Sequence, residues 1–313
     1  MSLGSVLALI QTASELGLIS ALTVIALYLS YSMLNVCDLS TDGCFTLGAT
    51  VGAVVTLSGH PFLALPAAMA AGIASGFITA FLQTKMGVNS LLAGIIVNTA
   101  LYSINIAVMG NSSILNLNKT DTVFTKALDL LRNTPLMEQY KLIVALLAVI
   151  IIGVLLALFL RTKLGLAIRA TGNNPDMVRS SSINPVFTTI VGLCIANSFT
   201  ALSGCLLAQS QKSANIDMGT GMVTIALASL LIGGILFSKR RGIAVRAVCS
   251  VVGALIFRLV YTAALRFNMP AYMLKLVSSV IVIIAISAPY LKKQFPKIKR
   301  RLELRSKKEV SKV

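Results

Sequence analysis

Long apolar runs recur along this chain of 313 residues and restrict its fold more than any other feature. Several runs reach about 20 residues, the length that an α-helix needs to cross a bilayer. Only 12% of the residues are charged, roughly half the share in a soluble domain. Backbone groups in lipid must be hydrogen-bonded, and these runs are continuous rather than alternating, so they predict helices and not barrel strands. We therefore expect an all-α polytopic membrane protein.

The apolar segments number nine, which predicts about 8–10 transmembrane or re-entrant helices. Two segments are short and begin in polar, glycine-containing sequence, DLSTDG at 38–43 and DMGTG at 217–221. Such interruptions are typical of broken helices, and the two segments could be equivalent elements of two inverted repeats, over 16–110 and 185–290. The nine segments cover 9–34, 43–58, 61–83, 88–110, 140–160, 185–209, 218–237, 243–265 and 270–290.

The net charge of +17 is concentrated in three places, namely 161–182, 238–242 and the tail 291–313. Basic residues beside membrane spans mark the cytoplasmic side, whereas the loop 111–139 is balanced in charge. We therefore expect a transmembrane domain over 1–290, an external loop at 111–139 and a basic cytoplasmic tail over 291–313. The tail is expected to touch anionic lipid. Its basic residues are not interleaved with aromatic ones, so no nucleic acid is expected as a partner.

The sequence offers no catalytic arrangement. It contains one histidine, five cysteines without metal-ligand spacing and no GxxxxGK[ST] phosphate loop. We also find no paired carboxylates or nucleophile and base that would suggest an enzyme. No cofactor or metal is therefore expected, and active transport would need an ion gradient or a partner that hydrolyses ATP.

A polar segment, RATGNNPDMVRSSSIN at 169–184, lies between two apolar runs on the expected cytoplasmic side. Asn174 can cap a helix, Pro175 suits its first position, and Asp176 would lie in its first turn, where the helix dipole favours an anion. The preceding TKLGLAIRAT at 162–171 is amphipathic. The loop 161–184 is thus expected to be an ordered element at the membrane surface.

Three carboxylates begin the short apolar segments: Asp38, Asp42 and Asp217. A carboxylate inside a membrane is costly, so such residues face protein or water and are often functional. Together with Ser40 and Gly43, they are candidates to line a translocation path. The alternative, compatible with the first, is that Asp38 and Asp217 cap their own short helices.

The fourth apolar segment carries a polar stripe. Asn98, Tyr102 and Asn105 follow one another at i, i+4 and i+7, and Ser90 and Gly94 extend the same helical face. A stripe of this kind can line a water-filled path, or it can hydrogen-bond neighbouring helices. The sequence leaves both interpretations open for the candidate path residues Asn98, Tyr102 and Asn105.

The sixth and eighth segments carry further features. Asn197, Ala201, Gly204 and Ala208 form a small-residue face, which predicts close helix packing. Arg258 lies well inside the eighth segment, where it would pair with an acidic residue or extend its guanidinium towards an interface.

Three stretches resemble permeases of ATP-binding cassette importers of the branched-chain amino acid and ribose type. They are NVCDLSTDGCFTLGATVGA at 35–53, TKLGLAIRATGNNPDMVRSSSIN at 162–184 and GTGMVTIALASLLIGG at 219–234. In that family the second stretch forms a coupling helix that docks in a groove of the ATPase. Val178 and Ser182 depart from the family pattern, which usually has alanine and often glycine there. The resemblance assigns coupling to Gly165, Arg169, Ala170, Gly172 and Asn173, with Asp176 beside them.

The resemblance implies the permease subunit of an importer in a bacterial plasma (inner) membrane, with its C-terminus in the cytoplasm. It further implies a permease homodimer, an ATPase subunit and an external substrate-binding protein or lipoprotein. The substrate would be an amino acid, and the resemblance to the subfamily linked with tryptophan-type binding proteins implies an aromatic one. The alternatives are a secondary transporter that uses Asp38, Asp42 or Asp217 as an ion site, a permease for a sugar or nucleoside, and a membrane-embedded enzyme or scaffold.

Overall fold

The computed structural model describes residues 3–132, 137–236, 242–266, 273, 276–284 and 287. The predicted tail 291–313, most of the basic cluster at 238–242 and much of the ninth apolar segment lie outside the described residues. The elements are α1 (Leu3–Leu27), the π-helix η1 (Tyr28–Met33), α2 (Thr41–Leu57), α3 (Ala64–Thr84), α4 (Ser90–Val108), β1 (Ile114–Asn116), α5 (Val123–Leu131), the 3₁₀-helix η2 (Met137–Gln139), α6 (Tyr140–Phe159), α7 (Lys163–Asn173), α8 (Pro175–Ser180), α9 (Pro185–Gln211), β2 (Ser213–Asn215), α10 (Met222–Leu236) and α11 (Ile243–Arg266).

Each of the first eight predicted apolar segments forms a helix. Within the described part of the chain, six helices are long and apolar enough to cross a bilayer. The second and seventh segments form the two shorter apolar helices α2 and α10. The prediction of an all-α polytopic membrane protein with two short helices is confirmed. The inverted repeat stays a prediction.

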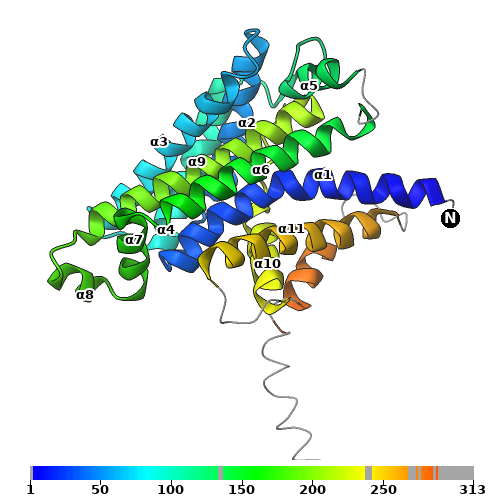
Figure 1. The fold of residues 1–313 in the computed structure, drawn as a ribbon. Helices are drawn as coiled ribbons and strands as arrows, with labels where there is room; N and C mark the ends of the chain where they lie inside the picture. Colours follow the sequence, from blue (N-terminus) through cyan, green and yellow to red (C-terminus); the bar gives the residue numbers. More distant parts are fainter. Residues whose placement is uncertain are drawn as a thin grey trace, which may run out of the picture.

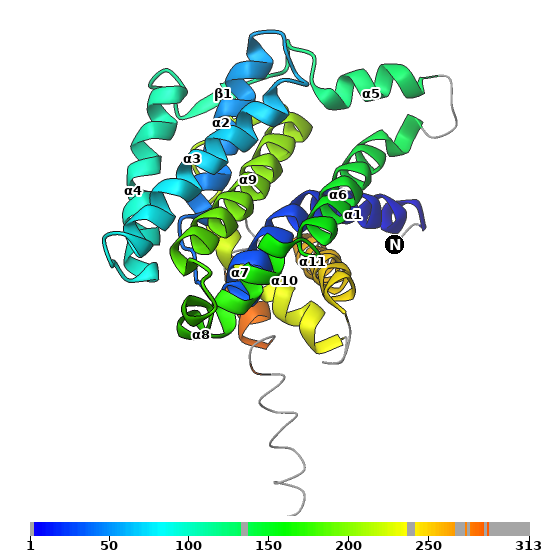
Figure 2. The same cartoon turned by 60° about the vertical axis from the view of Figure 1, so that its left-hand side comes forward.

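The helices pack in two groups on either side of α9 (Figures 1 and 2). One group consists of α2, α3 and α4, and the other consists of α1, α6, α10 and α11. Within its span α9 is mostly buried, whereas α4 and α6 are mostly exposed. Because lipid tails are as apolar as leucine, the exposed faces of α4 and α6 suit lipid contact. Helix α9 contacts helices of both groups, and α2 also meets α10 directly.

Small residues allow α9 to approach α2 closely. A Cβ on Gly204 of α9 would overlap the carbonyl oxygen of Phe45 on α2. Likewise, a Cβ on Gly48 of α2 would overlap the backbone of Ala201 on α9. Close backbone approach at small residues is a main source of helix association in membranes. The predicted small-residue face at 197–208 is therefore confirmed as a packing surface.

The loop 111–139 contains structure that the sequence did not predict. β1 pairs antiparallel with β2, with Leu115 opposite Ala214. Helix α5 follows, with a capping box at its start, and the Val123 amide donates to the buried Gln209 Oε1 on α9 at 3.0 Å. These elements lie at the opposite end of the molecule from α7 and α8 (Figure 2). The loops 111–139 and 161–184 are thus at opposite ends, as the charge distribution predicts.

Arg258 on α11 lies beside an aromatic ring. Its guanidinium carbon is 5.7 Å from the ring centre of Tyr261, a cation–π distance. The one ion pair among the described residues joins Lys126 to Asp121 in the loop 111–139. Arg258 was expected either to pair with an acidic residue or to extend towards an interface. Within the part of the chain that the structure describes, it has no acidic partner.

Candidate functional site

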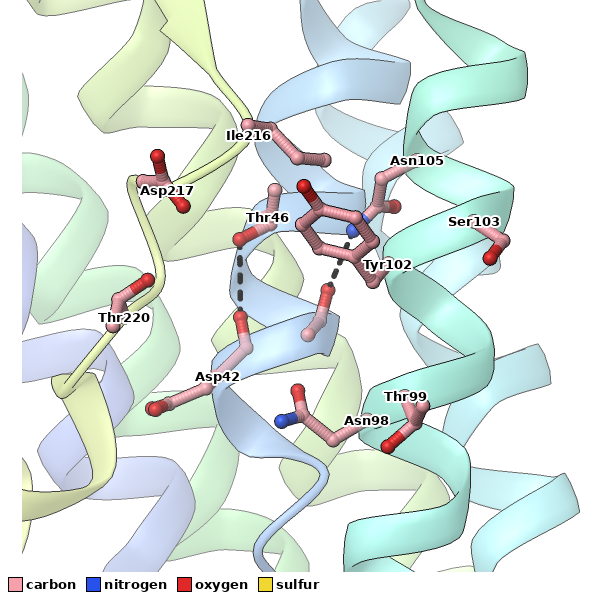
Figure 3. A pocket seen from close by; sticks show the side chains of 11 residues that line it. Asp42, Thr46, Asn98, Thr99, Tyr102, Ser103, Asn105, Ile216, Asp217 and Thr220 are labelled. Carbon is pink, nitrogen blue, oxygen red and sulfur yellow. Dashed lines mark hydrogen bonds between the residues drawn. The ribbon is translucent and has the colours of Figure 1, made fainter. Parts of the chain in front are cut away.

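A cavity of about 380 Å³ lies between α2, α4 and the segment that connects β2 to α10. Figure 3 shows α2 at the back, α4 on one side and the connecting segment on the other. Its volume is within the range of small-molecule sites. The α4 residues that line it lie between positions 98 and 105, in the middle and second half of that helix. Its lining residues are Asp42, Gly43, Thr46, Asn98, Thr99, Tyr102, Ser103, Asn105, Ile216, Asp217 and Thr220.

Six of the eight residues predicted for a translocation path line this one cavity. They come from three distant parts of the sequence, and the helix packing brings them together: Asp42, Gly43, Asn98, Tyr102, Asn105 and Asp217. The other two, Asp38 and Ser40, do not line it. Both are buried behind the start of α2.

The Asp42 carboxylate caps a helix other than its own. One oxygen accepts the Gly221 amide at 2.9 Å, and the other accepts the Val223 amide at 2.8 Å, both at the start of α10. A carboxylate at this position satisfies free amides and interacts favourably with the helix dipole. The expectation that Asp217 caps α10 is therefore wrong. Asp42 takes that role because the packing places the beginnings of α2 and α10 against each other.

Further contacts hold the segment before α10 against α2. The Gly219 amide donates to Thr46 Oγ1 at 3.1 Å. A Cβ on Gly219 would overlap the carbonyl oxygen of Asp42, so only glycine allows this approach. Thr220, between these contacts, lines both the cavity and a second cavity of about 290 Å³ on the side of α11. The contacts with Asp42 and Thr46 therefore position the wall between two cavities.

Asp38 lies in a buried hydrogen-bond network, not in the cavity. Its side chain is 2% exposed. One carboxylate oxygen accepts the Ser40 amide at 2.8 Å and the Ser40 hydroxyl at 2.6 Å, and the other accepts Asn197 Nδ2 of α9 at 2.8 Å. The three donors compensate for the burial of the carboxylate. Asp38 thus orders the approach to α2 and attaches it to α9, and the network accounts for its presence without substrate contact.

The polar stripe of α4 combines the two roles that the sequence left open. Asn105 is 1% exposed, and its Nδ2 donates to the Gly43 carbonyl at 3.3 Å. Asn98 Oδ1 lies only 2.6 Å from where a Cβ of Gly43 would stand. Gly94 packs against Leu39 in the same way, with the Leu39 amide 2.7 Å from its Cβ position. The stripe therefore joins α4 to α2, and it also faces the cavity.

Five lining residues were not predicted from the sequence. Thr99 and Ser103 are the direct neighbours of Asn98 and Tyr102, so a wider polar face on α4 could have indicated them. Thr220 lies inside DMGTG, a sequence already identified as a break. The pattern offered no signal for the remaining two, Thr46 and Ile216, because they face the cavity only through the packing of α2 and the β2–α10 connection.

The loop 161–184 is ordered, as predicted: the stretch that begins at Asn174 forms the expected short helix α8, and the amphipathic stretch before it forms a second helix, α7. The Asn174 side chain accepts the Asp176 and Met177 amides at 3.0 and 3.1 Å, and Pro175 is the first residue of α8. Among the predicted coupling residues, Asn173 and Asp176 are exposed. Met177, which the sequence analysis did not single out, is 59% exposed on the same short helix. Together with Asn174 and Pro175, these three residues form the accessible part of the α7–α8 turn, 173–177.

The other predicted coupling residues face inwards to different degrees. Arg169, Ala170 and Gly172 are half-buried, and Gly165 is buried. A Cβ on Gly165 would overlap the Phe159 carbonyl oxygen at the end of α6, so this glycine serves the tight α6–α7 turn. Gly165 therefore shapes the loop and does not belong to its exposed surface.

Gly172 is the point where α7 meets the end of η1, the π-helix that continues α1. A Cβ there would overlap the Met33 carbonyl oxygen, and it would lie 2.8 Å from Leu34 Cα. Leu34 is buried and also touches α9, because its Cδ1 lies 2.5 Å from the Cβ position of Gly192. Leu34 is thus enclosed between α7 and α9. A movement of α7 would press directly on the segment that leads to α2.

The Asp42 cap predicts a loss of stability on substitution. Asp42→Asn should lower the free energy of unfolding by about 1–2 kcal/mol, because one acceptor oxygen and the charge facing the α10 amides are lost. Thermal unfolding of the purified protein measures the effect. Asp129→Asn, the same change on exposed α5, should have little effect. Equal stability of the Asp42 and Asp129 variants would show that the cap contributes nothing.

Comparison with known proteins places the chain among permeases. Residues 9–286 match the family described as branched-chain amino acid transport system, permease component. A tyrosine transport system permease protein of Clostridioides difficile (strain R20291) is 32% identical over 94% of this chain and 96% of its own length. The ribose import permease protein of Escherichia coli (strain K12) is 25% identical over 80% of this chain and 75% of its own length. No solved structure matches the chain.

The resemblance noted in the sequence thus extends over nearly the whole chain. The matched residues run from within α1 to beyond the end of α11 and include the cavity and the α7–α8 turn. The two motifs at 35–53 and 162–184 both lie inside the match. The chain therefore belongs to the family of permease components of branched-chain amino acid transport systems.

Proposed function

We propose that this protein is the membrane-spanning subunit of an ATP-binding cassette importer, and that it translocates an amino acid delivered by an external substrate-binding protein or lipoprotein. Membership of the permease family supports the transport role. The relative named as a tyrosine transport permease, similar over nearly the full length of both chains, supports an amino acid, and an aromatic one, as the substrate.

The observation that carries the proposal is the chain of contacts between the α7–α8 turn and the cavity. Gly172 packs on Met33 and Leu34. From Leu34 the chain runs through Asn35, which has a left-handed backbone (φ 56°), to the network of Asp38. Four residues later Asp42 caps α10 at the cavity wall. A short, well-packed route therefore connects the expected ATPase contact to the cavity.

In this mechanism an ATPase binds the exposed part of the α7–α8 turn at Asn173, Asp176 and Met177. Closure of the ATPase on ATP would displace α7 and, through Gly172, the segment that precedes α2. A shift of α2 changes the distance between Asp42 and the α10 amides that it caps. The wall between the two cavities would move with them, which gives access alternately to either side.

A phosphate loop for ATP hydrolysis is not found in these 313 residues, and the proposal assigns it to the ATPase subunit. We propose that the permease forms a homodimer above two ATPase subunits in a bacterial plasma (inner) membrane. The loop 111–139 would face outwards, towards the binding protein, and the C-terminus would lie in the cytoplasm. The distribution of basic residues supports this orientation.

Two other functions have some support. The ribose import permease of Escherichia coli is also a relative, which makes a sugar the second candidate substrate. A secondary transporter would need an ion site, and the cavity carboxylate of Asp217 is the candidate for it. Uptake that stops when ion gradients are collapsed, with ATP held constant, would favour the secondary transporter.

The proposal is tested by purifying the tagged chain from its native cells in mild detergent and identifying the co-purifying proteins by mass spectrometry. We expect an ATPase with a phosphate loop, which should be lost when 173–177 is replaced by a glycine and serine linker. The same tagged chain with Asp129→Asn is the control. A chain that purifies alone, and that moves solute in liposomes without ATP, would overturn the proposal.

A further inference from the structure

We infer that the cavity recognises its ligand by a protonated amine, with Asp217 as the residue that determines this specificity. The inference rests on the proposed function and deepens it. The ligand class is an amino acid with a free α-ammonium group and an uncharged side chain. Amines whose nitrogen is acylated, acidic amino acids and phosphorylated compounds should be rejected.

The charges of the cavity carry the first step. Its lining contains two carboxylates, those of Asp42 and Asp217, and none of its residues is a lysine, arginine or histidine. The Asp42 carboxylate is compensated by the Gly221 and Val223 amides and by the positive end of the α10 dipole. The exposed Asp217 carboxylate accepts no hydrogen bond from the described residues. The cavity therefore has an uncompensated negative charge at Asp217.

A second, independent observation indicates a ligand that donates hydrogen bonds. Asn105 is 1% exposed and lines the cavity. Its Nδ2 is bonded to the Gly43 carbonyl, which fixes the orientation of the amide. Its Oδ1 is buried and has no hydrogen-bond partner within the described ranges. A buried acceptor without a donor is unfavourable. A small side-chain movement that opens this closed-off oxygen to the cavity would therefore favour a ligand that donates a hydrogen bond to it.

The two observations agree on the ligand's chemistry. An ammonium group donates up to three hydrogen bonds, and its positive charge would pair with the Asp217 carboxylate. The α-carboxylate of the same ligand can be bound by neutral donors, for which Asn98, Tyr102 and Thr220 are available in the lining. A second acidic group would face two carboxylates, with no basic side chain among the residues that line the cavity. Figure 3 shows Asp217 and Thr220 across the cavity from Asn98 and Tyr102.

The inference is tested on the purified full-length chain by calorimetric titration with four compounds. They are L-tyrosine, tyramine (which lacks the carboxylate), N-acetyl-L-tyrosine (which lacks the ammonium) and D-ribose. We expect L-tyrosine and tyramine to bind at least about tenfold more tightly than N-acetyl-L-tyrosine, because charge-assisted hydrogen bonds are about twice as strong as neutral ones. D-ribose should bind no better than N-acetyl-L-tyrosine.

Asp217→Asn separates charge from shape, since asparagine keeps the size and one acceptor oxygen. It should weaken L-tyrosine and tyramine about tenfold and remove the discrimination against N-acetyl-L-tyrosine. Asp217→Glu should retain the discrimination. Asp129→Asn, an equal change of charge on exposed α5, should leave all four affinities unchanged.

Several results would overturn the inference. They are equal binding of L-tyrosine and N-acetyl-L-tyrosine, preferred binding of D-ribose, unchanged affinity in Asp217→Asn, and no binding of any of the four compounds. Preferred binding of D-ribose by a chain that co-purifies with an ATPase would reject amine recognition and leave the importer function intact. Amine-selective binding by a chain that co-purifies with no ATPase would support amine recognition and reject the importer function.

Discussion

Replacement of Gly172 by valine is expected to reduce ATP-driven uptake at least tenfold while the permease still inserts and still binds its ATPase. The reason is steric. A Cβ at this position would overlap the Met33 carbonyl oxygen and crowd Leu34, so α7 must move away from the end of the first helix. The exposed residues of the α7–α8 turn remain in place, and ATP hydrolysis should therefore continue without transport. Gly172→Ala should show a smaller effect of the same kind.

The measurement is ATP hydrolysis and solute uptake in the same reconstituted vesicles, expressed as solute moved per ATP. Gly153→Ala is the matched control, because a Cβ at that position of α6 meets nothing within 4 Å. The half-buried Arg169 lies one turn before Gly172, and its replacement by alanine together with Gly172→Val should uncouple the two activities further. Normal uptake in the double variant would contradict the coupling role of α7.

Replacement of Gly204 by leucine is expected to prevent stable folding. The Cβ alone would overlap the Phe45 carbonyl oxygen and lie 3.1 Å from the Ala49 amide nitrogen. Overpacking in a core commonly costs about 1–3 kcal/mol. Here the obstacle is backbone, which cannot rotate aside, so we expect a loss at or above about 3 kcal/mol. Separation of α9 from α2 would also disturb the Asp38 network and the cavity wall formed by Asp42.

The effect is measured as the amount of protein in the membrane and as the thermal unfolding midpoint of what can be purified. Gly153→Leu provides the control, since it adds the same side chain to a membrane helix at an open position. Gly204→Ala should be intermediate. Wild-type abundance and stability of Gly204→Leu would show that α2 and α9 can separate without loss of stability. The prediction that their close contact is needed for folding would then be wrong.

The sequence alone determined the positions of the membrane helices and of α8, because the signals involved are local. Apolar length set the positions of the membrane helices, and the polar starts at 38–43 and 217–221 identified the two short ones. The sequence around Asn174 and Pro175 predicted α8 with its cap, which the structure has. Small residues on α9 predicted a close packing face. Each of these features depends on neighbours within a few helical turns.

Only the tertiary structure decided which polar groups act together. Asp42 and Asp38 look alike in the sequence. Yet Asp42 accepts the α10 amides of Gly221 and Val223, which lie 179 and 181 residues away, whereas Asp38 accepts a hydrogen bond from Asn197, 159 residues away. The pairing of β1 with β2 is likewise distant and involves only three residues on each side. No local pattern specifies such partners. Helix packing at glycine contacts specifies them, because it fixes which helix ends meet and therefore which amides each carboxylate accepts and which carboxylates line the cavity.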